Sequence, residues 1–163
     1  MSGTTLIAAA ALNCWAAAGI RYNLPVDLLY AVGQVESNHR VDAIGINKGG
    51  KSRDLGAMQI NSTWLPTLRQ FGITEHVLLT QPCTNIQVGA WILSNEVARA
   101  GYTWQAIGAY NAGPITAKTS PAARARKLAI YRGYANKVLA RWKQLAEKRA
   151  TASANKETVN ARG

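Results

Sequence analysis

Glu36 is an acidic residue that stands among the apolar residues of a predicted helix. Residues 25–37 repeat apolar side chains at three- and four-residue steps, which predicts a helix with one buried face. At about 100° per residue, Glu36 projects between Leu29 and Val32, inside the apolar arc. A carboxyl group that loses hydration there favours its protonated form, which suits general acid catalysis near neutral pH. Two structural alternatives stay open, which are exposure by fraying of the helix end and pairing with a base in the core.

Two further motifs carry neutral polar groups that suit the binding of sugars. They are Gly56-Ala57-Met58-Gln59-Ile60-Asn61 and Ala109-Tyr110-Asn111-Ala112-Gly113. Cleavage of a glycosidic bond needs an acid for the leaving oxygen, together with donors that hold hydroxyl and acetamido groups. The amides and the phenol of these motifs can hold a sugar without competing for the proton. Each motif also has a structural alternative, because amides satisfy loop backbone groups and Asn-Ala-Gly can stop a helix.

Taken in order with Glu36-Ser37, these motifs resemble the family-1 lytic transglycosylases, which have a goose-type lysozyme-like fold. The resemblance covers residues 14–142. It is strongest to the small branch that opens gaps in peptidoglycan for type III and type IV secretion or conjugation machines. The segment that starts at Cys14-Trp15 also resembles the beginning of that branch.

The resemblance implies a role for each matching residue. Glu36 matches the catalytic acid and base of a reaction that cleaves the β-1,4 bond after N-acetylmuramic acid and leaves a 1,6-anhydro end. The residues that it assigns to the sugar groove, around that acid, are Ser37, Met58, Gln59, Asn61, Tyr110, Asn111 and Tyr134. The sequence therefore predicts a peptidoglycan-cleaving enzyme with one main acid.

Asp54 departs from this pattern, because most members of the family that the chain resembles have a single catalytic carboxylate. Certain secretion-linked members carry an aspartate at this place. Such a residue would stabilise positive charge on the sugar or hold a water, which favours hydrolysis by a lysozyme-type muramidase. In the structural alternative, Asp54 caps a turn or pairs with Arg53 or Lys51. A third hypothesis is a non-catalytic, glycan-binding scaffold of a secretion complex, in which Glu36 is vestigial.

The elements that must position these residues are mainly α-helical. We expect one lysozyme-like transglycosylase domain over residues 13–150, with a loop or short hairpin at 39–56, after the catalytic helix. Short helices are expected over residues 58–113, and a long amphipathic helix begins near Pro121. The apolar stripe of that helix consists of Leu128, Tyr131, Ala135, Val138, Trp142 and Leu145.

The two ends of the chain and its two cysteines bear on the compartment. Residues 1–12 resemble either a truncated export signal without its basic start or the beginning of an alanine-rich helix. Cys14 and Cys83 are either buried free thiols or one bridge. Because the resemblance implies a periplasmic protein, we expect the bridge. Residues 151–163 lack apolar anchors, which predicts a disordered polar tail.

The net charge of +11 over 163 residues predicts attraction to nucleic acid, acidic lipid or an anionic cell-wall polymer. Basic residues gather between Arg124 and Arg149, where a solvated helix face is the structural alternative. This stretch has no helix-turn-helix pattern and no aromatic residues interleaved for base stacking. We therefore expect a monomer whose partners are peptidoglycan strands and secretion or conjugation components, without nucleic acid. Two cysteines and two histidines without ligand-like spacing predict no metal site, and no cofactor is implied.

Overall fold

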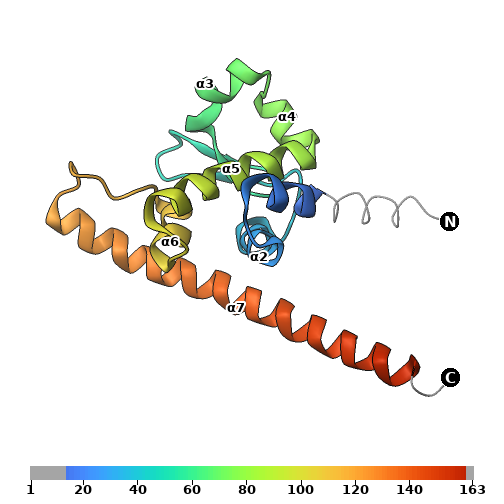
Figure 1. The fold of residues 1–163 in the computed structure, drawn as a ribbon. Coiled ribbons are helices and arrows are strands. Elements are labelled where there is room, and N and C mark those ends of the chain that lie inside the picture. The colour runs from blue at the N-terminus through green and yellow to red at the C-terminus, as the bar shows by residue number, and fades with distance from the viewer. Residues whose placement is uncertain (1–13, 161–163) are drawn as a thin grey trace.

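The computed structural model describes residues 14–160, with side chains described through residue 154 (Figure 1). The fold is mainly helical, which confirms the predicted class. After a helix over residues 14–22, the elements follow in the order α2 (Val26–Ser37), β1 (Ile44–Ile46), β2 (Arg53–Leu55), β3 (Ile60–Asn61), η1 (Ser62–Trp64), α3 (Leu65–Leu68), η2 (Arg69–Phe71), α4 (Glu75–Thr80), α5 (Pro82–Ala100), α6 (Trp104–Ala112) and α7 (Pro121–Asn160). Helices η1 and η2 are short 3-10 turns.

Helix α5 lies in the middle of the fold and packs against α4 and α6 (Figure 1). Its buried Asn85 is an internal polar anchor, because the amide donates to the carbonyls of Leu55 (2.8 Å) and Leu78 (3.0 Å) and accepts from the backbone N–H of Met58 (2.8 Å). A Cβ atom at Gly56, whose φ is +73°, would lie 2.2 Å from the Asn85 amide nitrogen. Glycine is therefore required where the second motif begins.

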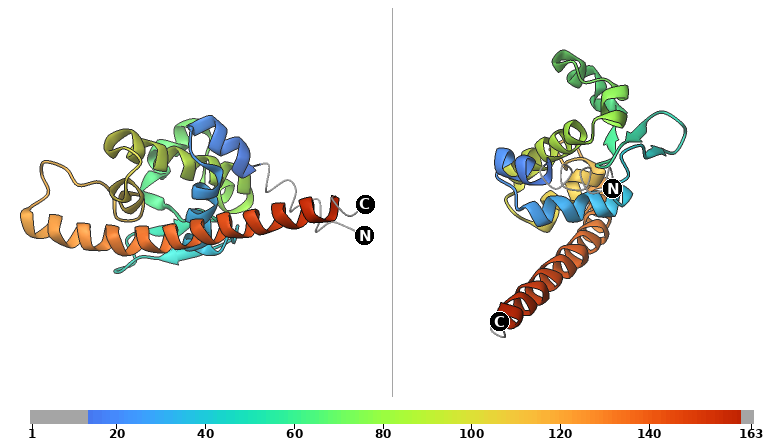
Figure 2. Two further views of the ribbon diagram at one scale, coloured as in Figure 1. Left: turned by 60° about the horizontal axis from the view of Figure 1, so that its bottom comes forward. Right: turned by 90° about the vertical axis from the view of Figure 1, so that its right-hand side faces the viewer.

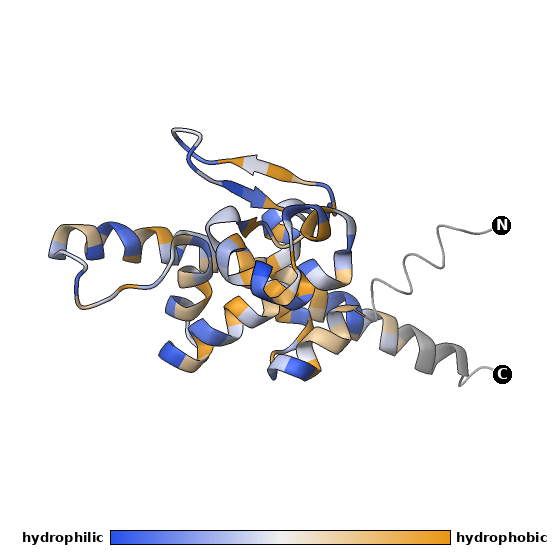
Figure 3. Ribbon diagram, turned by 90° about the horizontal axis from the view of Figure 1, so that it is seen from above, coloured by the Kyte–Doolittle hydropathy of each residue, from blue (hydrophilic) through white to orange (hydrophobic). Residues whose placement is uncertain are grey.

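The short hairpin predicted after the catalytic helix is present as an antiparallel, three-stranded sheet in the order β1-β2-β3. Asp54 on β2 faces Gly45 on one neighbouring strand and Asn61 on the other. Strands β1 and β2 extend away from the helices, as the view from above shows (Figure 3). The hairpin thus carries Asp54 on an arm that leaves the helical core.

Helix α7 crosses α6 and α2 and extends beyond the other helices (Figure 2). The predicted stripe holds it in place, since Tyr131, Ala135 and Val138 are buried while Trp142 and Leu145 pack partly buried against the core. Its crossing with α6 is close, because a Cβ atom at Gly108 would lie 2.2 Å from the Cβ of Tyr131.

Helix α7 continues to Asn160 and covers most of the stretch for which a disordered tail was predicted. Residues 151–160 mix good helix formers (alanine, lysine and glutamate) with weaker ones (threonine, serine, asparagine and valine), and neither proline nor glycine interrupts them. An ion pair between Arg149 and Asp27 of α2, at 2.6 Å, lies one turn before this extension. Absent apolar anchors therefore did not end the helix. The last predicted tail residues, 161–163, lie outside the described residues.

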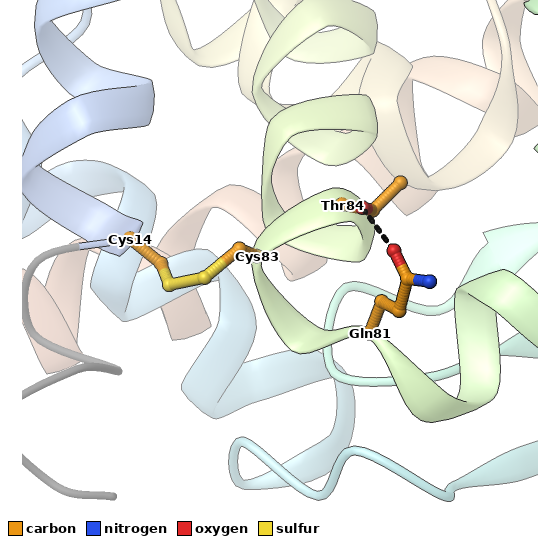
Figure 4. Close-up of a disulfide and its surroundings, with 4 residues drawn as sticks. All are labelled: Cys14, Gln81, Cys83 and Thr84. Carbon is orange, nitrogen blue, oxygen red and sulfur yellow. Dashed lines mark hydrogen bonds between the residues drawn. A yellow bond between two sulfur atoms is a disulfide. The ribbon is translucent and has the colours of Figure 1, made fainter. Parts of the chain in front are cut away.

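Cys14 and Cys83 form a disulfide that joins the helix over residues 14–22 to the first turn of α5 (Figure 4). Their Cα atoms are 5.0 Å apart, within the usual range for a bridge. Of the two alternatives left by the sequence, the structure contains the bridge. The prediction for residues 1–12 lies outside the described part of the chain. Within that part, no helix combines the length and the apolar character that crossing a bilayer requires.

Candidate active site

A cleft of about 620 Å³ lies between the end of α2, the hairpin, β3, α6 and α7. Six of the residues singled out in the sequence line this cleft together, namely Glu36, Asp54, Gln59, Asn61, Tyr110 and Asn111. Asn47, Lys48 and Ile130 also line it, although their sequence patterns did not mark them as site residues. The fold therefore gathers polar groups from distant segments around one acid.

Glu36 is held by the way in which α2 ends. Asn38 adopts a left-handed conformation with φ at 55° and donates its backbone N–H to Gln34, which closes the helix. The hydroxyl of Ser37 donates to the carbonyl of Ala57 at 2.8 Å and so ties the helix end to the second motif. Glu36 is consequently fixed in the last turn, with its side chain in the cleft.

Burial raises the pKa of Glu36 to about 7, from an ordinary value of 4.5. The negative charge of Asp54 also raises this pKa, whereas a hydrogen bond from Tyr134 lowers it. The Tyr134 hydroxyl donates to Glu36 Oε1 across the contact between α7 and α2. Burial also raises the pKa of Tyr134 well above 10, so the phenol remains a donor at neutral pH. The acid thus changes protonation within the neutral range.

Asp54 is surrounded by amides. Asn61 Nδ2 donates to Asp54 Oδ1 at 2.7 Å, and Asn47 Nδ2 donates to Asp54 Oδ2 at 3.1 Å. The hydroxyl oxygen of Ser52 accepts from the same two amides, at 3.1 Å from Asn47 and 3.3 Å from Asn61. Both carboxylate oxygens are therefore held in place on the cleft wall by amide donors. The surroundings of Asp54 are thus polar, whereas Glu36 has lost much of its hydration.

The other amides of the second motif make bonds within the protein, as the structural alternative predicted. Gln59 has φ at +48° and donates its amide to the carbonyls of Gly56 (2.9 Å) and Ala43 (3.3 Å). Asn61 accepts from the backbone N–H of Thr63 at 3.0 Å, in addition to holding Asp54. Both residues line the cleft while they also order the loop that forms it.

Ser37, Met58 and Tyr134 are not among the residues that line the cleft, and the prediction that they bind sugar stays a prediction. The side chain of Met58 is fully buried and packs against Gly89 of α5, where a Cβ atom would lie 2.7 Å away. Its backbone carbonyl accepts from the Tyr110 hydroxyl at 2.7 Å. Tyr134 is 7% exposed and is directed to Glu36. The contacts that the structure shows for these residues lie within the protein, to Ala57, Tyr110 and Glu36.

Tyr110 and Asn111 stand at the end of α6, whose position depends on a residue that the sequence did not single out for the site. Lys127 of α7 donates to the carbonyls of Ala112 (2.8 Å), Gly113 (3.2 Å) and Pro114 (3.1 Å). In the sequence, Lys127 counted only as one charge of the basic stretch. Its spacing from Tyr131 and Tyr134, on one helix face, is the signal that would have indicated an inward position.

Among the residues that the structure describes, no three histidine, cysteine, aspartate or glutamate side chains form a group that could hold a metal ion. The chemistry available to the cleft is proton transfer by Glu36, charge stabilisation by Asp54 and hydrogen bonding by amides and phenols. These are the groups that cleavage of a glycosidic bond requires.

Known proteins similar to this chain include a peptidoglycan-related family and several relatives. The family model described as the transglycosylase SLT domain matches residues 13–131. The chain is 41% identical over 151 residues to the invasion protein IagB of Salmonella typhimurium, with 88% of each chain covered. It is 39% identical to the protein IpgF of Shigella flexneri, over 75% of this chain and 79% of that protein. A putative peptidoglycan-binding-like protein of Escherichia coli K12 is 41% identical, with 67% and 73% covered.

Proposed function

Because this chain belongs to the transglycosylase SLT family, we propose that it is a lytic transglycosylase that cleaves the MurNAc-β-1,4-GlcNAc bond of peptidoglycan and leaves a 1,6-anhydro end. The observation that carries the proposal is Glu36, a partly buried carboxyl group whose pKa is raised to about 7, in a cleft lined by hydrogen-bonding groups. Such a group holds a proton for a leaving oxygen at neutral pH and can take a proton back afterwards.

In the first step, protonated Glu36 gives its proton to the oxygen that links the two sugars, and the bond from C1 to that oxygen breaks. In the second step, the Glu36 carboxylate takes the proton of the C6 hydroxyl while O6 bonds to C1 of the same sugar. No water is consumed, and the acid is regenerated. The Tyr134 hydroxyl stabilises the carboxylate that exists between the two steps, because it donates to Oε1.

Asp54 faces the same cleft and is proposed to stabilise positive charge at C1 while the bond breaks. Its two amide donors keep it in place for this role. The same placement favours a second candidate function, a lysozyme-type muramidase, in which Asp54 holds a water that reaches C1 before O6 does. The two candidates share Glu36 and differ in the product.

Mass spectrometry of digested peptidoglycan tests both candidates. The transglycosylase gives muropeptides with a 1,6-anhydro end, whereas a muramidase gives reducing ends that have gained one water. Purified peptidoglycan is digested with the wild-type chain and with Glu36→Gln, which keeps the size of the side chain. Only reducing ends in the wild-type digest would replace the first candidate by the second. Equal digestion by the two proteins would exclude Glu36 as the acid, whereas no digestion by either protein would leave the non-catalytic scaffold.

We also propose that the enzyme acts in the periplasm, where it opens the wall for a type III, type IV or conjugation machine. The disulfide supports this compartment, because such bridges persist under oxidising conditions. The similarity to a protein named for invasion supports the link to a cell-surface process. In a host strain that lacks the gene, the wild-type chain should restore transfer or secretion and Glu36→Gln should not. Restoration by Glu36→Gln would contradict a catalytic role there.

A further inference from the structure

A second hollow, the α5 groove, lies apart from the catalytic cleft. It measures about 510 Å³ and runs between the helix over residues 14–22, the turn after α3, and α5. Its apolar and aromatic lining consists of Tyr22, Leu68, Phe71, Ile73, Val88 and Trp91. Phe71 is 73% exposed, and among the exposed large apolar residues of the described chain it is the one that lines this groove.

The wall shared with the catalytic cleft is a pair of tryptophans. Trp64 lines the cleft and Trp91 lines the α5 groove, and their rings meet edge to face with centroids 5.2 Å apart. The Cys14–Cys83 bridge ties the helix over residues 14–22 to α5, so two walls of the groove are covalently fixed to each other. A ligand would therefore meet a preformed site, which reduces the cost of ordering on binding.

Gln87 gives the α5 groove a polar feature. Its Oε1 atom is buried and has no hydrogen-bond partner among the described residues, while the side chain lines the groove. Oε1 itself is closed to solvent, so a ligand in the groove would pair with the amide through Nε2 or after the amide turns over, and either contact calls for a ligand that hydrogen-bonds. A peptide backbone offers both N–H and C=O groups and so matches either orientation of the amide, whereas an acyl chain offers neither.

The charge at the α5 groove is positive. Arg21 is exposed and is the charged residue among those that line it, and none of the lining residues within the described chain is acidic. The Arg21 guanidinium lies 5.7 Å from the centroid of the Tyr22 ring, at the edge of the apolar lining. A ligand with a carboxylate beside an apolar group would complement this arrangement.

We infer that the α5 groove binds a segment of a partner protein in an extended form, with an apolar side chain set among Phe71, Val88 and Trp91, a backbone amide paired to Gln87 and an acidic residue paired to Arg21. This interaction surface is additional to the proposed function and does not depend on catalysis by Glu36. It places the bound partner next to the catalytic cleft, across the tryptophan pair.

Fluorescence anisotropy with the full chain tests the inference. The probe is a labelled peptide of alternating glutamate and leucine or phenylalanine residues, blocked at both ends, and the matched peptide has lysine in place of every glutamate. We expect saturable binding of the acidic peptide and binding about ten-fold weaker, or more, for the lysine peptide. Arg21→Glu should reverse this preference. Equal binding of both peptides by the wild-type chain would overturn the inference.

Three further variants locate the site. Phe71→Ser and Gln87→Met should each weaken binding of the acidic peptide, the first about ten-fold. Ile46→Ser is the control, because Ile46 is 77% exposed on the hairpin and does not line the groove. Binding that Ile46→Ser weakens as much as Phe71→Ser does would mean unspecific adhesion to exposed apolar residues. Unchanged binding in Phe71→Ser would also overturn the inference.

Other occupants give different results with the same proteins. Displacement of the peptide by vesicles of anionic phospholipid would assign the groove to a lipid surface, and self-association that Phe71→Ser abolishes would assign it to a second copy of the chain. Either outcome overturns the peptide proposal. Glu36→Gln should bind the peptide with the affinity of the wild type, so failure of catalysis and failure of peptide binding are separate results.

Discussion

The two carboxyl groups of the cleft stand in opposite surroundings. Glu36 stands in the last turn of α2, where loss of hydration brings its pKa to about 7 although it accepts a hydrogen bond from Tyr134. Asp54 stands on a hairpin that leaves the core, and each of its oxygens accepts from an asparagine amide. One setting retains a proton, and the other fixes a carboxylate as an acceptor. Local packing therefore gives different surroundings to two acids whose side chains differ by only one methylene group.

The largest expected effect comes from removing the acidic proton at Glu36. Glu36→Gln should lower the rate of peptidoglycan cleavage at least about 100-fold, because an amide cannot supply the proton for the leaving oxygen. Turbidity of a peptidoglycan suspension measures the rate, and the melting curve of the variant shows whether it is folded. A folded variant with more than a tenth of the wild-type rate would contradict the role of Glu36.

The same substitution should reveal the burial of Glu36 as a cost in stability. The pKa of Glu36 is raised on folding from 4.5 to about 7, so the folded state binds the proton more tightly and stability falls as pH rises between these values. Glu36→Gln carries no such charge. Its free energy of unfolding relative to the wild type should therefore increase by about 2 kcal/mol from pH 5 to pH 8. Urea titration at both pH values measures this difference, and a constant difference would mean that Glu36 is hydrated.

Asp54→Asn removes the second charge of the cleft and tests whether Asp54 acts on Glu36 and on the substrate. We expect a loss of about ten-fold in rate, because the developing positive charge on the sugar loses its partner. The fall of kcat/KM at high pH should also move to lower pH, since the charge of Asp54 raises the pKa of Glu36. Asp42→Asn is the matched control, because Asp42 is exposed and lies outside the cleft. Equal pH profiles in both variants would show that Asp54 does not act on Glu36.

Tyr134→Phe should give the smallest effect, mainly on the pH profile. The hydrogen bond from Tyr134 lowers the pKa of Glu36, so its loss should move the fall of kcat/KM to higher pH and slow the reaction by a few-fold, about 1 kcal/mol. Tyr102→Phe serves as the control, because Tyr102 is 57% exposed and does not line the cleft. A shift in the opposite direction would mean that Tyr134 acts on the protonated acid.

Local patterns predicted the elements on which both acids stand. The apolar repeat over residues 25–37 corresponds to α2 (Val26–Ser37), and the Gly- and Lys-rich stretch after it corresponds to the hairpin. The stripe from Leu128 to Leu145 packs α7 against the core. Periodicity works here because each helix buries one face, which marks its sequence every three or four residues. It did not predict the continuation to Asn160, because residues 151–160 have no apolar repeat that would mark a helix in the sequence.

The apolar repeat placed Glu36 on the apolar side of a helix, and the motifs near Asn61 and Asn111 predicted groups that bind sugars. Only the tertiary structure decided which groups act on the acids. Tyr134 reaches Glu36 across 98 residues, Asn47 and Asn61 converge on Asp54, and Met58 is withdrawn into the core. The physical reason is that local patterns set which face of an element is buried, whereas hydrogen-bond partners depend on how distant elements pack.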